Sequence, residues 1–557
     1  MWRLRDLLNL KSFSAAIWTL LIEELLIFGA RQPSLDNRPW SPQLLLISMV
    51  SSNFAGSMET RSQRVGFPDV GPFLCKLSRY YISFFDISLQ RTEKIREWHI
   101  RYGPIICIGP KEVSVATPTL MREIYGSAGG YAKSKYFDHF VAYGERALFA
   151  IRPYEDHRER RKVIASFYHD VSKASVENHI NERVDRVIGQ IDRRQGDPPI
   201  DVFSLTSHFA FDIISRLLYG KRHCSRTIGV DGEERQILHD LKKAQLWGPV
   251  KFDMPSLYGF IRFLLSLLNC LPSPLHADED LMRWNYNKIN DVLAHSGGAT
   301  TDVREDSLLH RLLNATNPDG KKLSLNYITS ELYDNLNAAE ITVAVSLTYI
   351  IYHLSENPKW QTRIREEILG LPCEVNGFPS FTSINSAPIM EAFIREVYRV
   401  NPGTGGHAER VVPSGGKIYD GIYIPEGIRI TASTIALHHD ATIFTSPDVF
   451  DPTRWLGRTP SQARTLDRSL IPFGYGARIC AGKLLATMEI KLLIARLYVR
   501  YETRVDPCSK TTRQSMAQYA THDSVPRGLR CDITFHLIED GNGEGQQTSE
   551  RVRVREE

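Results

Sequence analysis

Hydrophobic residues recur every three to four positions along most of the chain, which is the pattern of helices that bury one face. The clearest case is residues 327–356, which predict one long helix that ends before Pro358. Another predicted helix has Pro388 in its first turn and Pro402 beyond its end. The pattern predicts mostly helix over residues 78–101, 176–222, 235–295, 327–356, 359–369, 387–400 and 480–499.

Short apolar runs bounded by turn residues predict a smaller amount of sheet. Residues 105–115 are largely apolar and are interrupted by Gly109-Pro110, which predicts two paired strands. Residues 410–437 have the composition of strands and turns. The expected fold class is therefore mainly α with a small β-sheet region.

Composition divides the chain into four segments. An apolar run, residues 13–30, has nearly the length of a membrane-spanning helix. Glu23 and Glu24 lie near its middle, and each acidic group there costs about 2.5–3.5 kcal/mol in a bilayer. A spanning anchor, a helix lying on the membrane surface and a wrongly assigned first exon all stay open. The predicted segments are an N-terminal membrane anchor (1–30), a linker (31–66), a folded body (67–538) and a disordered tail (539–557).

Charge and cysteine content exclude several classes of protein. The chain has 557 residues, and its 68 Lys and Arg nearly balance its 64 Asp and Glu, so no strong basic bias points to nucleic acid. Its eight cysteines show neither a C-x-x-C motif nor the spacing of a zinc site. A disulfide framework and a structural zinc ion are therefore not expected. A reducing, cytosol-facing location is expected instead.

Residues 473–482 form a glycine-rich loop, F-x-x-G-x-R-x-C-x-G, that leads into the last predicted helix. Gly474 and Gly476 let a flat macrocycle approach the backbone, and Arg478 offers a fork of donors to a propionate. A helix beginning at Cys480 would direct its free N–H groups at the sulfur and favour the thiolate. The loop suits Cys480 to be an axial ligand of haem iron, and a core cysteine in a turn is the alternative.

The loop resembles the haem-binding signature of the cytochrome P-450 family. All defined positions of that signature are matched, namely Phe473, Gly476, Arg478, Cys480 and Gly482. The resemblance extends from about Phe67 to Leu537. It implies the P-450 fold, haem b as cofactor and Cys480 as the ligand of its iron.

Two further motifs stand in the order that the family has. Glu396 and Arg399 form E-x-x-R on the predicted helix before Pro402, and residues 450–455 resemble the family's F-x-P-x-R-W segment, which supplies Arg454. By resemblance, Glu396, Arg399 and Arg454 form a buried ion-pair cluster behind the haem loop. Their role is structural, because they hold the loop and do not take part in the reaction.

Three more residues match positions that contact the haem propionates in the family. His157 and Arg161 are one helical turn apart and so share a face. Arg410 corresponds to an arginine on a strand of the family fold. The alternative for His157 and Arg161 is a solvated basic helix, since other charged residues surround them.

The long helix carries Ala338-Ala339-Glu340-Ile341-Thr342, which is similar to the family's oxygen-activation segment. The resemblance makes Thr342 the alcohol that assists proton delivery. Ile341 stands where the family usually has an acid, and Glu340 is one position earlier, about 100° away around the helix. Either Glu340 serves as the acid through a distortion and a water, or the proton path differs. A core threonine bonded to its own helix is the alternative for Thr342.

The resemblance implies a haem-thiolate monooxygenase that inserts one oxygen atom from O2 into an apolar small molecule. Tyr131, Phe137, Phe140 and Phe149 would line its pocket, or else belong to ordinary core. No flavin or nicotinamide site is visible, so NADPH would supply electrons through NADPH–cytochrome P-450 reductase. The fungal character of the sequence implies secondary metabolism, with terpenoid, polyketide or alkaloid substrates, at the cytosolic face of the endoplasmic reticulum membrane. Alternatives are an isomerase, a dehydratase or a coupling enzyme of this fold, and a haem protein without activity.

Overall fold

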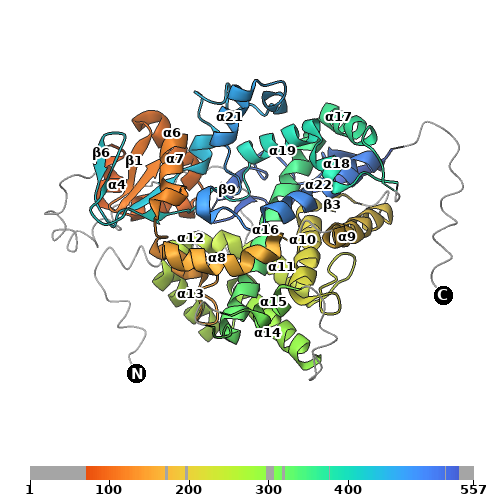
Figure 1. The fold of residues 1–557 in the computed structure, drawn as a ribbon, viewed down its shortest axis with the longest axis horizontal. Coiled ribbons are helices and arrows are strands. Elements are labelled where there is room, and N and C mark those ends of the chain that lie inside the picture. Colours follow the sequence, from red (N-terminus) through yellow and green to blue (C-terminus); the bar gives the residue numbers. More distant parts are fainter. Residues whose placement is uncertain are drawn as a thin grey trace, which may run out of the picture. The chain divides into compact units, whose positions relative to one another are not determined.

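The computed structural model describes residues 70–169, 174–194, 198–295, 307–316, 320–374, 377–520 and 522–538 (Figure 1). These residues lie within the predicted folded body. The predicted membrane anchor (1–30), linker (31–66) and disordered tail (539–557) lie outside the described residues.

Contacts between residues divide the chain into two units. The smaller comprises the residues up to Val115 together with Val412–Ile430. The larger comprises Ala116–Val411 and the residues from Thr431 onward. Every residue predicted for the functional site belongs to the larger unit.

The smaller unit contains three helices and two hairpins among its described residues. Its elements are α4 (Phe73–Leu77), α5 (Tyr80–Ile87), α6 (Arg91–Tyr102), β1 (Ile105–Gly109), β2 (Glu112–Val115), β5 (Lys417–Tyr419) and β6 (Ile422–Ile424). β1 and β2 pair antiparallel, with Ile105 opposite Val115. The prediction of two paired strands over residues 105–115 is therefore confirmed.

The prediction of a single helix over residues 78–101 is wrong, because the chain turns between α5 and α6. Leu89 has a left-handed backbone (φ +58°), and the N–H of Gln90 donates to the carbonyl of Phe85 (2.7 Å). This closes the end of α5 and reverses the chain. The reversal lets Phe85 and Tyr81 pack on Trp98 of α6, at ring-centroid distances of 5.7 and 5.9 Å.

The larger unit is built mainly from helices. They are α7 (Pro118–Tyr125), α8 (Tyr154–His169), α9 (Ala174–Asp192), α10 (Val202–Tyr219), α11 (Glu233–Ala244), α12 (Gly248–Asp253), α13 (Pro255–Leu267), α14 (Ala277–His295), α15 (Leu308–Asn314), α16 (Leu325–Glu356), α17 (Pro358–Leu369), α18 (Phe381–Asn385), α19 (Pro388–Val400), α20 (Thr434–His438), α21 (Pro460–Ser469) and α22 (Lys483–Arg500). A three-stranded antiparallel sheet is formed by β3 (Ile200–Asp201), β11 (Asp532–Leu537) and β8 (Tyr501–Val505).

The predicted strand and turn region, residues 410–437, contains strands but ends in a helix. β4 (Arg410–Val411) and β7 (Arg429–Ala432) lie within it, as do β5 and β6. The final residues form α20, because the side chain of Ser433 caps the helix by accepting the N–H of Ala436 (3.3 Å).

Helix α16 is the central helix of the larger unit and packs along α10 (Figure 1). Ser324 caps its start by accepting the N–H of Tyr327 (3.1 Å), and Pro358 follows its end. Among the described helices, α16 alone is long and apolar enough to cross a membrane, yet 78% of its most apolar stretch is buried inside the protein. Its apolar character is therefore that of a helix buried in the protein core. The long helix predicted for residues 327–356 is confirmed.

Candidate functional site

The loop that carries Cys480 is closed by its own backbone. A short 3-10 turn, η8 (Gly476–Arg478), precedes Cys480, whose N–H donates to the carbonyl of Phe473 (2.9 Å). The N–H of Gly482 donates to the Cys480 sulfur. Helix α22 begins at Lys483, so the prediction that a helix begins at Cys480 is wrong. The backbone of Cys480 is engaged by the loop instead, and Gly482 provides the N–H that reaches the sulfur.

The environment of Cys480 does not by itself stabilise a thiolate. The side chain is accessible, but surrounding protein atoms desolvate it, and this burial raises the pKa of the thiol. The Gly482 N–H, Arg161 and Lys483 act in the opposite direction without cancelling the effect. The expectation that the loop favours thiolate over thiol is therefore not met by the protein alone. Coordination to a metal would deprotonate the thiol outright.

Gly476 is required by a backbone contact. Its φ is +72°, and a Cβ there would lie 2.1 Å from the carbonyl oxygen of Tyr125. Gly474 also has a left-handed backbone (φ +75°), but the space around it is open. The sequence predicts that both glycines let a macrocycle approach the backbone. The structure adds that Gly476 lets the loop pack against the end of α7.

Five cationic or basic side chains gather beside the loop. His157, on α8, is buried at their centre, and burial lowers its pKa to about 2, with further lowering by Arg478, Lys133, Arg161 and Arg410. Four of the five, all except Lys133, are predicted from the sequence. The structure therefore brings together residues from α8, β4 and the Cys480 loop. We call Lys133, His157, Arg161, Arg410 and Arg478 the cationic cluster.

Lys133 is the member of the cationic cluster that sequence reasoning missed. Its ammonium group donates to the carbonyl of Phe149 and lies 4.3 Å from the ring centroids of both Phe137 and Phe149. Burial, then Arg410 and Arg478, lower its pKa well below the usual value. No motif marks Lys133 in the sequence, since a buried lysine looks like an exposed one until its neighbours are known.

The cationic cluster has a donor left for an anion. Arg478 donates from its two Nη atoms to the carbonyls of Ile151 (3.0 Å) and Arg152 (2.9 Å), while its buried Nε has no hydrogen-bond partner among the described residues. Burial and, to a lesser extent, the neighbouring Arg410 lower the pKa of Arg478 to about 10. Mutually repelling buried cations with an unused donor form a site for a ligand that carries negative charge.

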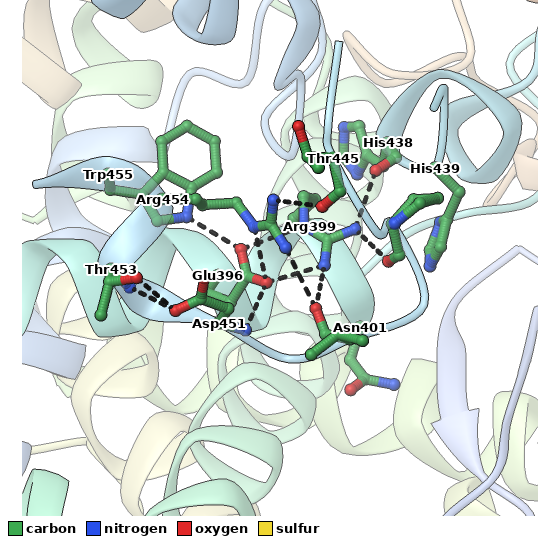
Figure 2. Close-up of polar contacts among 12 residues, drawn as sticks. Glu396, Arg399, Asn401, His438, His439, Thr445, Asp451, Thr453, Arg454 and Trp455 are labelled. Atoms are coloured by element: carbon green, nitrogen blue, oxygen red, sulfur yellow. Dashed lines mark hydrogen bonds and ion pairs between the residues drawn. The ribbon is translucent and has the colours of Figure 1, made fainter. Parts of the chain in front are cut away.

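A second cluster holds the region behind the loop (Figure 2). The carboxylate of Glu396 is fully buried and accepts two hydrogen bonds from Arg399 (2.7 and 3.0 Å) and one from Arg454 (3.0 Å). It also accepts the N–H of Asp451 and the indole N–H of Trp455, each at 2.9 Å. The arrangement predicted for Glu396, Arg399 and Arg454 is thus present, with additional donors that saturate the carboxylate.

His438 connects this cluster to the Cys480 loop, and no sequence motif marks it. Arg399 donates to the carbonyl of His438 (3.1 Å), and the Nε2 atom of His438 accepts the N–H of Ile471 (3.0 Å), just before the loop begins. Burial lowers the pKa of His438 to about 3, with contributions from His439 and Arg399. The imidazole is therefore neutral, which leaves Nε2 able to accept.

One face of α16 is accessible although most of the helix is buried. Ala338 is exposed, and Asn335, Ala339 and Thr342 are half-buried. The hydroxyl of Thr342 donates to the carbonyl of Ala338 (2.8 Å). We call the face formed by Asn335, Ala338, Ala339 and Thr342 the Thr342 face. It places the predicted hydroxyl where a ligand can reach it.

Glu340 lies on a different face of α16. Its carboxyl group is buried and accepts the hydroxyl of Ser207 on α10. Burial raises its pKa to about 7, with Ser207 and Lys242 opposing the shift. Ile341 is also buried. The structure thus does not bring Glu340 together with the Thr342 face, as the 100° step around the helix implies.

Aromatic rings cluster near the cationic cluster. Phe140 packs against Phe149 and His522, at centroid distances of 5.0 and 4.9 Å, and Phe137 packs on Phe149 at 5.3 Å. Tyr136 stacks on His407 at 4.5 Å. Burial lowers the pKa of His522 to about 3, and His407 and Lys133 lower it further. The three phenylalanines that the sequence places in a pocket wall are therefore neighbours.

Comparison with known proteins decides the family. The model of the family described as Cytochrome P450 matches residues 78–523. The chain belongs to the cytochrome P450 family. A cytochrome P450 monooxygenase of Gibberella zeae, FGM1, is 37% identical over 470 residues, which cover 84% of this chain and 91% of that protein. The cytochrome P450 monooxygenase cypX of Dothistroma septosporum is 25% identical over 476 residues, which cover 84% and 90% of the two chains.

A solved structure of the family has the same fold. The retinoic acid-bound cyanobacterial protein CYP120A1 superposes with a TM-score of 0.62 at 18% identity, covering 80% of this chain and 94% of that one. The mainly helical P450 fold predicted from the sequence is thereby confirmed, and the enzyme class is that of an oxidoreductase, a monooxygenase. The family uses haem iron and O2, and the donors of this P450 fit haem: one accessible sulfur, and cations with an unused N–H for propionates.

Proposed function

We propose that this P450 inserts one oxygen atom from O2 into an apolar small molecule in fungal secondary metabolism. The observation that carries the proposal is the Cys480 loop with the cationic cluster beside it. The Thr342 face adds an accessible hydroxyl. The aromatic cluster supports an apolar substrate. The relatives named above, which are fungal monooxygenases, support the reaction class.

Each residue of the site has a role in this proposal. Bound haem supplies the chemistry of O–O cleavage, which a thiolate ligand favours. Cys480 provides the thiolate, and the Gly482 N–H and Arg161 partly offset the cost of its burial. Lys133, Arg410 and Arg478 bind propionate charge. The Thr342 hydroxyl, on the accessible face of α16, would hold a proton for the reaction.

Electrons and membrane contact come from outside the described site. We propose that NADPH–cytochrome P450 reductase donates the electrons, and that the apolar residues 13–30 associate the enzyme with the cytosolic face of the endoplasmic reticulum. Extraction of membranes with alkaline carbonate tests the second point, since a spanning anchor stays in the pellet and a surface-lying helix is released.

The first experiment is the carbon monoxide difference spectrum of the reduced protein. A strongly red-shifted Soret band that disappears in Cys480→Ala would support thiolate ligation, whereas its absence from the intact protein would contradict the proposal. Turnover with a reductase in isotopically labelled O2 then separates the reaction types. Product that gains label is a monooxygenase product, and unlabelled product would favour an isomerase, a dehydratase or a coupling reaction, which the isoleucine at position 341 also favours.

A further inference from the structure

The Thr342 face lacks the acid that usually neighbours the hydroxyl. Ile341 is buried, and the carboxyl group of Glu340 is held by Ser207 on α10. Protons for O–O cleavage must therefore reach Thr342 by another route if the proposed function holds. In the first half of α16 the other carboxylic acids are Glu331 and Asp334.

A hydrogen-bonded row runs along α16 at intervals of one helical turn. The hydroxyl of Tyr327 donates to Oε2 of Glu331 (2.7 Å), and the Nδ2 atom of Asn335 donates to Oε1 of the same carboxylate (3.1 Å). Residues at this spacing share one face of a helix. Glu331 is completely buried in the middle of the row, and the N–H of Leu148 also donates to it (2.9 Å).

The outer end of the row reaches a surface pocket. Tyr327 lines a pocket of about 550 Å³ together with polar residues of α8, including Asp156, Glu159 and Arg160. The guanidinium of Arg160 lies 4.0 Å from the centroid of the Tyr327 ring. Tyr327 thus stands between the pocket and Glu331, which is completely buried, and the relay requires solvent in the pocket to exchange protons with the Tyr327 hydroxyl.

The inner end of the row begins the Thr342 face. Asn335 is half-buried, and its Oδ1 accepts the hydroxyl of Tyr168, which fixes the amide so that Nδ2 points at Glu331. The next positions along the same face are Ala338, which is exposed, and Thr342. The small alanine side chains keep this stretch open to solvent between Asn335 and the Thr342 hydroxyl.

We propose that Glu331 relays protons from the pocket at Tyr327 to the Thr342 face. In one passage, Tyr327 gives its hydroxyl proton to the Glu331 carboxylate and takes another from solvent in the pocket. The buried Glu331 carboxyl group then turns past Asn335, gives its proton to solvent on the Thr342 face and returns to the carboxylate. Only O–H bonds form and break, and no electron moves. Asn335 is a positioning residue, since an amide holds the carboxyl group without carrying the proton.

The surroundings of Glu331 act on its pKa in opposite directions. Burial raises its pKa, while Tyr327, the Leu148 N–H, Asn335 and Arg160 act to lower it. Asp334 on the same helix and Tyr168 on α8 also interact with its charge. A hydroxyl can donate or accept, so the Tyr327–Glu331 bond can run in either direction. Asp334 has no comparable link to the pocket, since the bond found for its carboxyl group comes from the N–H of Phe149.

Infrared spectroscopy of the haem-loaded, full-length protein tests the outer half of the route without turnover. In mildly acidic buffer, the carbonyl stretch of protonated Glu331 should be present and should be absent from Glu331→Gln. On transfer to D2O this band should shift at least about tenfold more slowly in Tyr327→Phe than in wild type. Tyr333→Phe, at a half-buried tyrosine of the same helix, is the matched control and should exchange as wild type does. An unchanged rate in Tyr327→Phe, or a band insensitive to Glu331→Gln, would overturn the proposal.

Oxygen consumption tests the inner half. With reductase, NADPH and no added substrate, reduction of O2 to water uses two NADPH per O2, and release of hydrogen peroxide uses one. Glu331→Gln should slow water formation about 10²-fold and shift the products toward peroxide, as loss of a proton donor does. A wild-type product ratio in Glu331→Gln, or a shift in Glu340→Gln alone, would overturn the relay. Loss of the carbon monoxide signature in wild type would instead refute the proposed function, and the exchange experiment would still decide the relay.

Discussion

Lys133 shows how a single residue can be unfavourable for the haem-free protein and favourable for the complex. Its ammonium group is desolvated between two phenylalanine rings and repelled by Arg410 and Arg478. Asp334 offsets part of this effect, but a buried charge that is incompletely compensated costs free energy, and a bound propionate would compensate the remainder. The two states should therefore respond in opposite directions to its removal.

We predict that Lys133→Met weakens haem binding while leaving the haem-free protein as stable as wild type or more stable. Losing one member of a buried charge pair costs about 2–5 kcal/mol, so haem affinity should fall at least about thirtyfold. Haem transfer to apomyoglobin measures the affinity, and urea unfolding measures the stability. Lys135→Met is the matched control, because Lys135 is exposed and its removal should change neither quantity. A parallel loss of both quantities in Lys133→Met would show a merely structural role.

The residues of the site differ in how far the sequence could predict them. Cys480, Arg478 and Glu396 stand in short motifs with fixed spacing, so the pattern alone singles them out. Lys133 and His438 act through neighbours that are distant in sequence, namely Arg410 and Ile471. Such contacts are made by the fold, and no local pattern encodes them. Glu340 is a third case. Helix geometry indicated that its side chain lies on another face than Thr342, but the hydrogen bond that its carboxyl group accepts from Ser207 on α10 depends on the fold.

At the scale of elements, the Glu396 cluster connects α19 to the segment around Arg454 and, through His438, to the Cys480 loop. We predict that Glu396→Gln destabilises the protein by about 3–5 kcal/mol, because two buried guanidinium groups lose their counter-charge. Urea unfolding and haem retention measure the effect. Asp467→Asn removes the exposed partner of Arg395, a residue of the same helix as Glu396, and should cost under about 1 kcal/mol. Equal costs for the two variants would contradict the role given to the cluster.

Helix α16 carries the prediction for the reaction itself. Thr342→Val keeps the shape of the side chain and removes the hydroxyl, so the protein should retain haem and the carbon monoxide spectrum. It should form less product per NADPH and more hydrogen peroxide, by about tenfold or more, because a proton donor is lost. Thr342→Ser, which restores a hydroxyl, should recover most of the coupling. A variant that loses haem instead would place Thr342 among the residues that support the fold.

The elements were predictable where periodicity was strong and unpredictable where a turn interrupted it. The long pattern of residues 327–356 corresponds to α16 because most of the helix is buried in one core. The pattern of residues 78–101 continues across Leu89 without a glycine or proline, so nothing in it marks the left-handed turn between α5 and α6. The predicted start of α22 was too early, because the sequence does not show that the N–H of Cys480 donates to the carbonyl of Phe473 within the loop.

At the scale of the whole molecule, buried titratable groups set how stability depends on pH. Seven histidines have pKa values lowered to about 4 or below, mainly by burial: His99, His157, His179, His208, His353, His438 and His522. Among the described residues, six acids have raised pKa values, again mainly through burial: Glu331, Asp334, Glu340, Glu489, Asp523 and Asp532. Below the usual pKa of histidine, the histidines and the acids have opposite effects on how stability changes with pH.

We predict that the haem-free protein is most stable at about pH 6. Below that pH the unfolded histidines bind protons and the folded ones do not, while the acids with raised pKa values hold protons in the folded state that the unfolded state has lost. Seven histidines against six acids leave about one more proton on the unfolded state, so stability falls by about 1.4 kcal/mol per pH unit on acidification. Above pH 6.5 the histidines no longer contribute, and stability falls as the folded acids ionise, with Asp334 titrating at about 8. Urea unfolding midpoints from pH 5 to 8 measure the curve. His438→Gln, which keeps an acceptor for Ile471, should remove about one proton from the acid slope, and an unchanged slope would show that His438 is not buried as a neutral imidazole.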